Sequence, residues 1–431
     1  MNAPLTVAIV DADGIGAFLP GALARYGTRA IHVRSDAPNV HFARRPVDLD
    51  VEVVHQGDLV RTATALRQQG VGFVVAGTES GVLLADALSA ELGTPGNGMT
   101  RPAARRDKRE MVAMVARAGL ATAASIATGS VQELLDWAGR LGTWPVVLKP
   151  PASAGSDHVL FCHSPEEVRE GFAAVLGAAD RYGRRNTAVL GQQFLKGEEY
   201  FVNTVSRHGR HHVVEVWRYQ KRLVDGSRPM YDYEEPVAPR HPAVALVTDY
   251  ALAVLDALEV RNGAAHTEVM LTPSGPVLIE SAARPGGSHE PAIVSRCLGT
   301  DQIDCLARAI VHPEDLLEGR LPQYRPRAAL RYVTLLSPAD GQVPSADRLA
   351  PVRALKTCVE LVLSAEPGAP VRRTVDLGSS PGYLYLSAPD WADVEADYRG
   401  LRQLEEAGLY QPAVLTPSDH ARELQEKAAR T

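Results

Sequence analysis

Two carboxylates and an arginine stand close together in the stretch HTEVMLTPSGPVLIESAARPGGSH, residues 266–289. Its pattern predicts two strands around a tight turn at Ser274-Gly275, and such a hairpin brings Glu268 and Glu280 side by side. Adjacent carboxylates repel each other unless a cation lies between them, and Mg²⁺ prefers oxygen ligands. The guanidinium of Arg284 can bind a phosphate or a carboxylate through two hydrogen bonds. A solvated hairpin with a surface salt bridge explains the same residues, so both interpretations stay open at this point.

A lysine and a loop of small residues form a second group with chemical potential. Lys149 ends the apolar strand pattern TWPVVLKPP and precedes the loop Ala152 to Ser156. Small residues let backbone N–H groups approach phosphate oxygens, and a lysine adds a point charge. The loop lacks the GxxxxGK[ST] pattern, so it does not indicate a P-loop ATPase. An ordinary strand connection is the alternative, and Lys108, in the helix start RRDKRE, also fits a solvated helix face.

The segment QQFLKGEE, Gln192 to Glu199, is an extended chain that enters a tight turn. Its exposed backbone N–H and C=O groups can pair with the edge of an adenine. Glu199 can accept hydrogen bonds from ribose hydroxyls, as acidic residues do in dinucleotide-binding folds. A hairpin turn with solvated glutamates is the alternative.

Composition limits the class of protein. A chain of 431 residues predicts two or three domains. The net charge of -6 gives no sign of a nucleic-acid-binding surface, and no apolar run approaches the length of a membrane span. The first residues begin a strand directly and show no secretory signal. The cysteines are scattered without a CxxC pair, so we expect a reduced, cytoplasmic protein without nucleic-acid or membrane partners.

The order of elements predicts a multidomain protein of α/β and α+β class. A β-α-β start places an N-terminal domain at residues 1–105, where DADGIG is only half of a dinucleotide fingerprint. Alternating strands and helices fill residues 106–325, with a lid part at about 120–195. Residues 326–431 form a strand-rich C-terminal domain that ends in the charged helix SDHARELQEKAAR.

Taken in order, these motifs resemble the ATP-grasp superfamily of carboxylate–amine ligases. The resemblance implies an ATP-grasp fold with an N-terminal Rossmann-like pre-ATP-grasp domain and a C-terminal α+β domain. It also implies roles for the motif residues: Lys108, Lys149, Ser153, Gly155 and Ser156 on the phosphates of ATP, Gln192, Gln193 and Leu195 along the adenine, Glu199 on the ribose, Glu268 and Glu280 on Mg²⁺, and Arg284 on a phosphate.

Two positions depart from the family pattern. The hinge usually begins with a glutamate, and this chain has Gln192, whose amide still forms hydrogen bonds. The hairpin usually contains E-x-N-x-R, and this chain has Ala282 at the asparagine position. Alanine cannot bind a metal, so the number of Mg²⁺ ions, one or two, stays open, with Mn²⁺ as a substitute.

The implied reaction is activation of a carboxylate by ATP to an acyl phosphate, followed by attack of an amine. Positioning and charge neutralisation do most of the work in phosphoryl transfer. The residues expected to act on the reacting groups are Arg284, Lys221 and His289, with Gly287, Ser288 and Tyr231 beside the substrates and Asp232 and Tyr233 near the amine. The loop 152–158 is expected to act as a lid that excludes water. For Tyr231 to Tyr233 a surface loop, and for Ser288 and His289 a structural role, stay open.

The run GTESGVLLADALSAELGTPGN at 77–97 is similar to L-amino-acid ligases, which make dipeptides. It therefore implies small-molecule substrates, either two amino acids or an amino acid and a related carboxylate. A homodimer, which is common in similar ligases, is the oligomeric state that the resemblance allows. Two alternatives remain. One is a biotin-carboxylase-like enzyme that activates bicarbonate, and the other is a non-catalytic nucleotide-binding regulatory protein, which the Ala282 departure favours.

Overall fold

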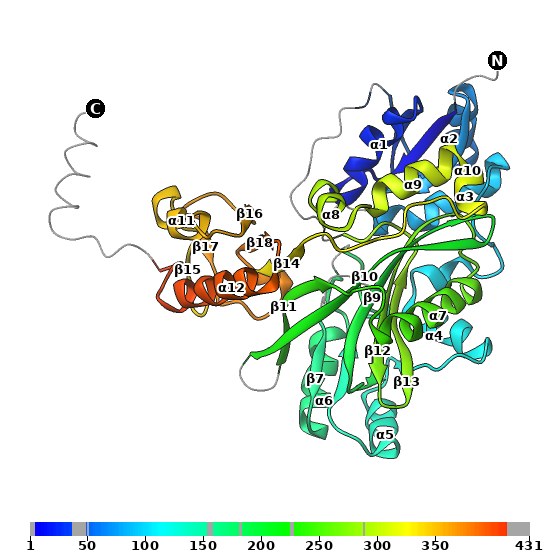
Figure 1. Cartoon of the computed structure of the whole chain (residues 1–431). Coiled ribbons are helices and arrows are strands. Elements are labelled where there is room, and N and C mark those ends of the chain that lie inside the picture. Colours follow the sequence, from blue (N-terminus) through cyan, green and yellow to red (C-terminus); the bar gives the residue numbers. More distant parts are fainter. Residues whose placement is uncertain are drawn as a thin grey trace, which may run out of the picture. The chain divides into compact units, whose positions relative to one another are not determined.

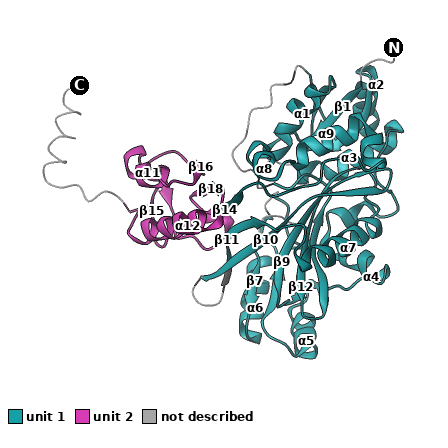
Figure 2. Cartoon of the chain, viewed as in Figure 1, with its two compact units in different colours: residues 1–332 teal, residues 333–431 magenta. Residues whose placement is uncertain are grey.

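The chain forms two compact units, residues 1–332 and 333–431 (Figure 2). The computed structural model describes residues 5–36, 49, 51–152, 158–180, 183–224, 228–287 and 289–411. The predicted phosphate-loop residues Ser153, Gly155 and Ser156, the substrate candidate Ser288 and the charged C-terminal helix lie outside these residues. The domain boundaries at 105 and 325 stay predictions.

The first unit begins with a parallel sheet of the order β3-β2-β1-β4 (Figure 1). Its strands are β1 (Thr6–Val10), β2 (Arg29–Arg34), β3 (Glu52–Val54) and β4 (Val71–Ala76), and its helices are α1 (Leu19–Arg25), α2 (Leu59–Gln68) and α3 (Val82–Leu92). Strand β1 is buried throughout, as expected for a strand covered on both faces. The predicted β-α-β start is therefore confirmed.

The turn after β1 is closed by hydrogen bonds within the protein. The Asp11 carboxylate accepts from the Ser35 backbone N–H and hydroxyl at 2.8 Å each, and from the Ser80 hydroxyl at 2.5 Å. These bonds join the ends of β1, β2 and β4 and hold the loop that carries Glu79. In this chain Asp11 therefore fixes a turn of the scaffold.

A second sheet, of the order β5-β8-β6-β7, is antiparallel. Its elements are β5 (Ser125–Thr128), α5 (Val131–Leu141), β6 (Val146–Lys149), β7 (Leu160–Cys162), α6 (Pro165–Val175) and β8 (Val189–Gln193). Leu134 of α5 and Phe172 of α6 pack on Val146 and Leu148 in one apolar core. The two helices thus stabilise the strand that ends in Lys149.

A long antiparallel sheet, of the order β13-β12-β9-β10-β11 within the first unit, holds the predicted hairpin and hinge. Its strands are β9 (Glu198–Arg207), β10 (Arg210–Val224), β11 (Arg228–Pro236), β12 (Gly263–Thr272) and β13 (Gly275–Ala282), and the helices around it are α4 (Lys108–Arg117), α7 (Pro242–Ala257), α8 (Pro291–Leu298), α9 (Gln302–Val311) and α10 (Pro313–Leu317). Val205 and Ala264 of this sheet, α9 and β1 share one apolar core.

Strand β14 (Ala329–Thr334) leads into the second unit, which contains β15 (Gly341–Gln342), α11 (Ala346–Arg353), β16 (Cys358–Leu363), β17 (Pro370–Val371), β18 (Gly382–Ala388) and α12 (Trp391–Glu406). Strands β16 and β18 pair antiparallel, and α12 packs on β18. The predicted mixture of strands and helices is confirmed for the described part of this segment. Among the described residues, no helix is both long and apolar enough to span a bilayer.

Arg105, which lies just before α4, forms hydrogen bonds to three other segments of the chain. Its guanidinium donates to Asp86 Oδ2, Leu258 O and Gly98 O at 2.8–2.9 Å, and its side chain is 1% exposed. Removing one partner of a buried ion pair leaves the other charge without compensation.

We therefore expect Arg105→Ala to lower the free energy of unfolding by about 3–5 kcal/mol, measured by urea denaturation. Arg101→Ala is the matched control, because Arg101 forms an exposed pair with Glu110 that contributes at most about 1 kcal/mol. Equal losses in the two variants would contradict this role of Arg105.

Candidate nucleotide and metal site

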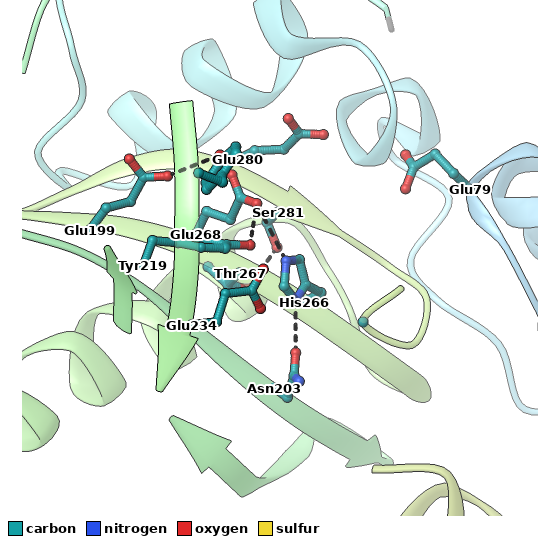
Figure 3. A network of polar contacts seen from close by, with 12 residues as sticks. Glu79, Glu199, Asn203, Tyr219, Glu234, His266, Thr267, Glu268, Glu280 and Ser281 are labelled. Carbon is teal, nitrogen blue, oxygen red and sulfur yellow. Dashed lines mark hydrogen bonds and ion pairs between the residues drawn. The ribbon is translucent and has the colours of Figure 1, made fainter. Parts of the chain in front are cut away.

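The predicted hairpin is present, and it places the two carboxylates directly opposite each other. Glu268 of β12 pairs with Glu280 of β13 in the strand register. On the other face of the hairpin the Thr267 and Ser281 hydroxyls form a hydrogen bond of 2.9 Å. Side chains alternate across a strand, so both glutamates face the same side of the sheet (Figure 3).

Two lysines from other elements approach this carboxylate pair. Lys108 begins α4, whose first turn is capped by the Asp107 side chain, and its Nζ lies 3.0 Å from Glu280 Oε2. Lys149 ends β6 and is buried. Burial and the nearby charge of Lys108 lower the pKa of Lys149 to about 8, although Glu280 and Glu268 oppose this shift. The hairpin, α4 and β6 therefore meet at one place.

The predicted hinge connects β8 to β9. Gln193 is fixed by a backbone hydrogen bond to Ala124 O at 2.8 Å, whereas Leu195 is half-buried in the connecting turn. A Cβ atom at Gly197 would collide with the backbone of Leu271, so this turn requires glycine. Gln192 is buried in β8.

Glu199 follows the hinge at the start of β9 and is buried. Lys221 Nζ lies 2.6 Å from its Oε2, and the Tyr231 hydroxyl lies 3.4 Å from its Oε1. Lys221 also lies over the Tyr231 ring, 4.3 Å from its centre. Tyr231 pairs with Lys221 across strands β11 and β10. The surface-loop alternative is therefore wrong for Tyr231, Asp232 and Tyr233, which all lie in β11.

Glu268 has partners that the sequence did not indicate. The Tyr219 hydroxyl donates to its Oε1 at 3.1 Å, and His266 Nε2 lies 3.4 Å from the same oxygen. Burial favours the neutral acid, but His266, Lys221 and Tyr219 outweigh burial and lower the pKa of Glu268 to about 2. The sequence did contain a signal for His266. It lies two residues before Glu268, and side chains two apart on a strand lie on the same face.

Arg284 is held by an acidic residue from the N-terminal sheet. Its Nε donates to Glu79 Oε2 at 2.8 Å, and its Nη1 donates to Pro285 O at 2.8 Å. Arg106 contacts the other oxygen of Glu79. Burial would raise the pKa of Glu79, but Arg106 and Arg284 lower it to about 2. An acidic residue just after a parallel strand, in GTES, was the signal that could have identified Glu79.

His289 lies in a buried aromatic and acidic environment. Its ring stacks on Trp217 at 3.9 Å, and its Nε2 lies 2.8 Å from Glu234 Oε2. The two atoms are close, but the angles at this contact are not those of a hydrogen bond. Tyr332 packs against the ring edge at 5.4 Å.

Three other substrate candidates have surroundings of their own. Gly287 is exposed, in the loop after Arg284. Asp232 pairs with Arg222 at 3.0 Å, and the Tyr233 ring lies under the Arg331 guanidinium at 4.0 Å. Their contact with an amine substrate stays a prediction.

The donor atoms at the hairpin suit a hard divalent cation. Glu268 and Glu280 offer carboxylate oxygens, which Mg²⁺ prefers. Among the described residues no group of three His, Cys, Asp or Glu side chains is placed to hold a metal ion, so the hairpin offers these two carboxylates. The ammonium group of Lys108 pairs with Glu280, which shows that a positive charge is favourable beside this carboxylate.

Comparison with known proteins places this arrangement in a family. The model of the ATP-grasp domain matches residues 143–291. Dapdiamide A synthase of Enterobacter agglomerans is 33% identical over 423 residues, which cover 94% of this chain and 99% of that protein. The chain belongs to the ATP-grasp family. The predicted family and enzyme class, an ATP-dependent ligase that forms carbon–nitrogen bonds, are confirmed.

More distant relatives share the fold. The L-arginine-specific L-amino acid ligase of Bacillus subtilis is 22% identical over 215 residues, 50% of this ATP-grasp chain and 51% of that protein. The crystal structure of an L-amino acid ligase from Bacillus licheniformis superimposes with a TM-score of 0.72 at 18% identity, over 94% of this chain and 98% of that chain. An ADP complex of N5-carboxyaminoimidazole ribonucleotide synthetase gives 0.68 at 16% identity, over 94% and 98%. These structures confirm the predicted fold class.

We expect Glu79→Gln to lower the free energy of unfolding at pH 7 by about 3 kcal/mol, because Arg106 and Arg284 lose their common counter-charge. The pKa of Glu79 is depressed, so its contribution is complete above about pH 4.5 and is lost as pH falls towards 2. Urea unfolding should therefore show a difference between wild type and variant that shrinks over this range. A constant difference would contradict it, and Glu91→Gln, in an exposed pair with Arg67, is the control.

Proposed function

We propose that this ATP-grasp protein joins the carboxylate of one amino acid to the amino group of another through an acyl phosphate, with release of ADP and phosphate. The observation that carries the proposal is the convergence of Lys108, Lys149 and Lys221 on the carboxylates Glu199, Glu268 and Glu280. Three lysines from separate elements provide the charge that a triphosphate needs.

Each residue then has a positioning task. Glu199 binds the ribose, and the backbone of Gln193 to Leu195 lies along the adenine. Lys108 and Lys149 hold the phosphates, together with Lys221. Arg284, held rigid by Glu79, stabilises charge on the transferred group. A fixed guanidinium costs no reorganisation during the reaction, so its stabilisation is available when the charge develops.

Glu268 and Glu280 are the residues proposed to hold Mg²⁺. The ion, when bound, neutralises charge on the phosphate oxygens. Tyr219 donates to one oxygen of Glu268 and thereby orients this carboxylate. Because Ala282 offers no donor, the site as predicted supplies two carboxylates and no asparagine.

The names of the relatives support amino acids as substrates. One relative is a dapdiamide A synthase and another is an arginine-specific amino acid ligase. Carboxylates and amines of this kind are small and charged, and Glu234 and the Tyr231 hydroxyl lie beside the proposed site to receive them. A homodimer and a cytoplasmic location remain part of the proposal, as does the absence of nucleic-acid and membrane partners.

Incubation with ATP, Mg²⁺ and mixed amino acids should release ADP and yield a product whose mass equals two amino acids minus water. Mass spectrometry identifies the pair that reacts. ADP release that depends on bicarbonate and biotin, without amino acids, would support the carboxylase-like alternative instead. No ADP release with any pool would support the non-catalytic alternative.

We expect Glu280→Gln to reduce the rate of ADP release at least about 100-fold, because an amide replaces a proposed metal ligand. Circular dichroism and the unfolding midpoint check that the variant is folded. Glu314→Gln, an exposed position on α10, is the control and should keep wild-type activity. Near-normal turnover of Glu280→Gln would contradict the metal assignment.

A further inference from the structure

A small cavity lies beside the loop that follows β13. Its walls include Asn203 of β9, Glu215 of β10, Gly286 and His289 of that loop, and Asp301 just before α9. The cavity measures about 10 Å³, which is room for one group of the size of a water molecule or an ammonium. It therefore suits one polar end of a small ligand, while the rest of the ligand lies outside it.

Glu215 brings an unpaired carboxylate oxygen to this cavity. Its side chain is 2% exposed, and its Oε1 accepts from Asn203 Nδ2 at 2.8 Å. Among the residues that the structure describes, neither Glu215 Oε2 nor the nearby indole N–H of Trp217 has a hydrogen-bond partner. A buried carboxylate oxygen without a partner costs free energy, and the usual explanation is a ligand, an ion or a water molecule at that atom.

Asp301 adds a second carboxylate to the cavity. It caps α9 by accepting the Asp304 backbone N–H at 2.8 Å, and it is 7% exposed. Burial raises the pKa of Asp301 to about 6, and the negative charges of Asp304 and Glu215 add to this shift. Burial also raises the pKa of Glu215. A positively charged occupant would relieve both carboxylates, because an opposite charge favours their ionised form.

The cationic side chains nearest to these carboxylates have other acidic partners. His289 Nε2 lies 2.8 Å from Glu234 Oε2, and Arg25 pairs with Asp304 at 2.6 Å. A metal ion is a poor candidate for the occupant, since no group of three His, Cys, Asp or Glu side chains in the described part of the chain is placed to hold one. An ammonium group has the matching size and charge, and it offers three N–H donors to the surrounding oxygens.

The cavity is held next to Arg284, the residue proposed to act on the transferred phosphoryl group. Gly286, two residues after Arg284, donates its N–H to Gln302 Oε1 at 2.7 Å. A Cβ atom at Gly286 would lie 2.9 Å from Asn203 Oδ1, so the loop approaches β9 as closely as a glycine allows. An ammonium in the cavity would therefore belong to a molecule whose other end lies towards Arg284.

The chemistry of the proposed reaction decides which ammonium belongs there. An amine that attacks an acyl phosphate must be neutral, because a protonated amine has no lone pair to donate. Carboxylates beside an amine favour its protonated form. Glu215 and Asp301 would therefore suppress the reaction of an attacking amine. They would suit the amino group of the amino acid whose carboxylate is activated, because that amino group must stay unreactive.

We propose that Glu215 and Asp301 bind the α-ammonium group of the amino acid that supplies the carboxylate, and thereby select donors with a free α-amino group. This assignment rests on the proposed function and names the class of its first substrate. Because the bound ammonium stays protonated, the donor does not attack a second activated molecule. Its amino group is therefore free in the product.

Trapping of the acyl phosphate with hydroxylamine tests this selection in the full-length protein. Each L-amino acid is compared with the L-2-hydroxy acid of the same side chain, which has nearly the same size but no ammonium, in the presence of ATP, Mg²⁺ and hydroxylamine. For every amino acid that gives a hydroxamate, we expect kcat/KM to exceed that of its 2-hydroxy acid at least about 30-fold. Glu215→Gln should reduce this ratio at least about tenfold through KM, while the KM for ATP stays within about twofold.

Asp301→Asn should lower the ratio in the same direction, and it keeps the cap of α9 because asparagine caps helices as well as aspartate. The matched controls are Glu314→Gln, at an exposed position on α10, and Asp58→Asn, at the exposed cap of α2, which should leave the ratio unchanged.

Equal use of amino acids and 2-hydroxy acids by the wild type would overturn the role of Glu215 and Asp301 and leave the proposed ligase function intact. A ratio that stays at the wild-type value in Glu215→Gln and Asp301→Asn would overturn it as well. Formation of no hydroxamate and release of no ADP with either class of acid would overturn both this role and the proposed function.

Discussion

The site depends on the placement of two like charges opposite each other in one hairpin. Glu268 and Glu280 are paired in register, and their side chains are only 19% and 23% exposed. Carboxylates removed from water repel each other more strongly than in solution, so the fold must bring cations to them. Lys108 comes from the start of α4 and Lys149 from the end of β6. The β12–β13 hairpin, α4 and β6 are therefore all needed to assemble one site.

The parts of this assembly that follow local rules were predictable from sequence. Alternating apolar residues and a turn indicate the hairpin. Asp107 indicates the start of α4, because it can cap a helix, and an apolar run that ends in lysine indicates β6. Local rules do not predict that these three elements meet in space. That expectation came only from the resemblance to a family. The contact of Arg284 with Glu79 spans 205 positions, and nothing in the pattern near Arg284 selects one acidic residue out of 51 Asp and Glu residues.

Strands β10 and β11 show why the region between hinge and hairpin was ambiguous. Asp232 breaks the apolar pattern that identifies a buried strand, so the segment Tyr231 to Tyr233 also fits a surface loop. In the sheet, Asp232 of β11 pairs with Arg222 of β10 at 3.0 Å, and Lys221 of β10 pairs with Glu199 of β9 at 2.6 Å. Charges that look solvent-exposed in the sequence are compensated across neighbouring strands. Such local conflicts are expected where a strand serves a ligand in addition to the core.

Under the proposed function, charge balance explains how one site can accept both a triphosphate and a cation. Three lysines and three carboxylates compensate one another: Lys221 lies against Glu199, Lys108 against Glu280, and the pKa of Lys149 responds to Glu280 and Glu268. A nucleotide with its metal ion carries both signs of charge as well. In the proposed reaction these groups exchange partners when the nucleotide binds: the lysines turn to the phosphates, and the carboxylates would hold the metal. No charge needs to be buried alone at any stage, because every group already has a counter-charge within reach.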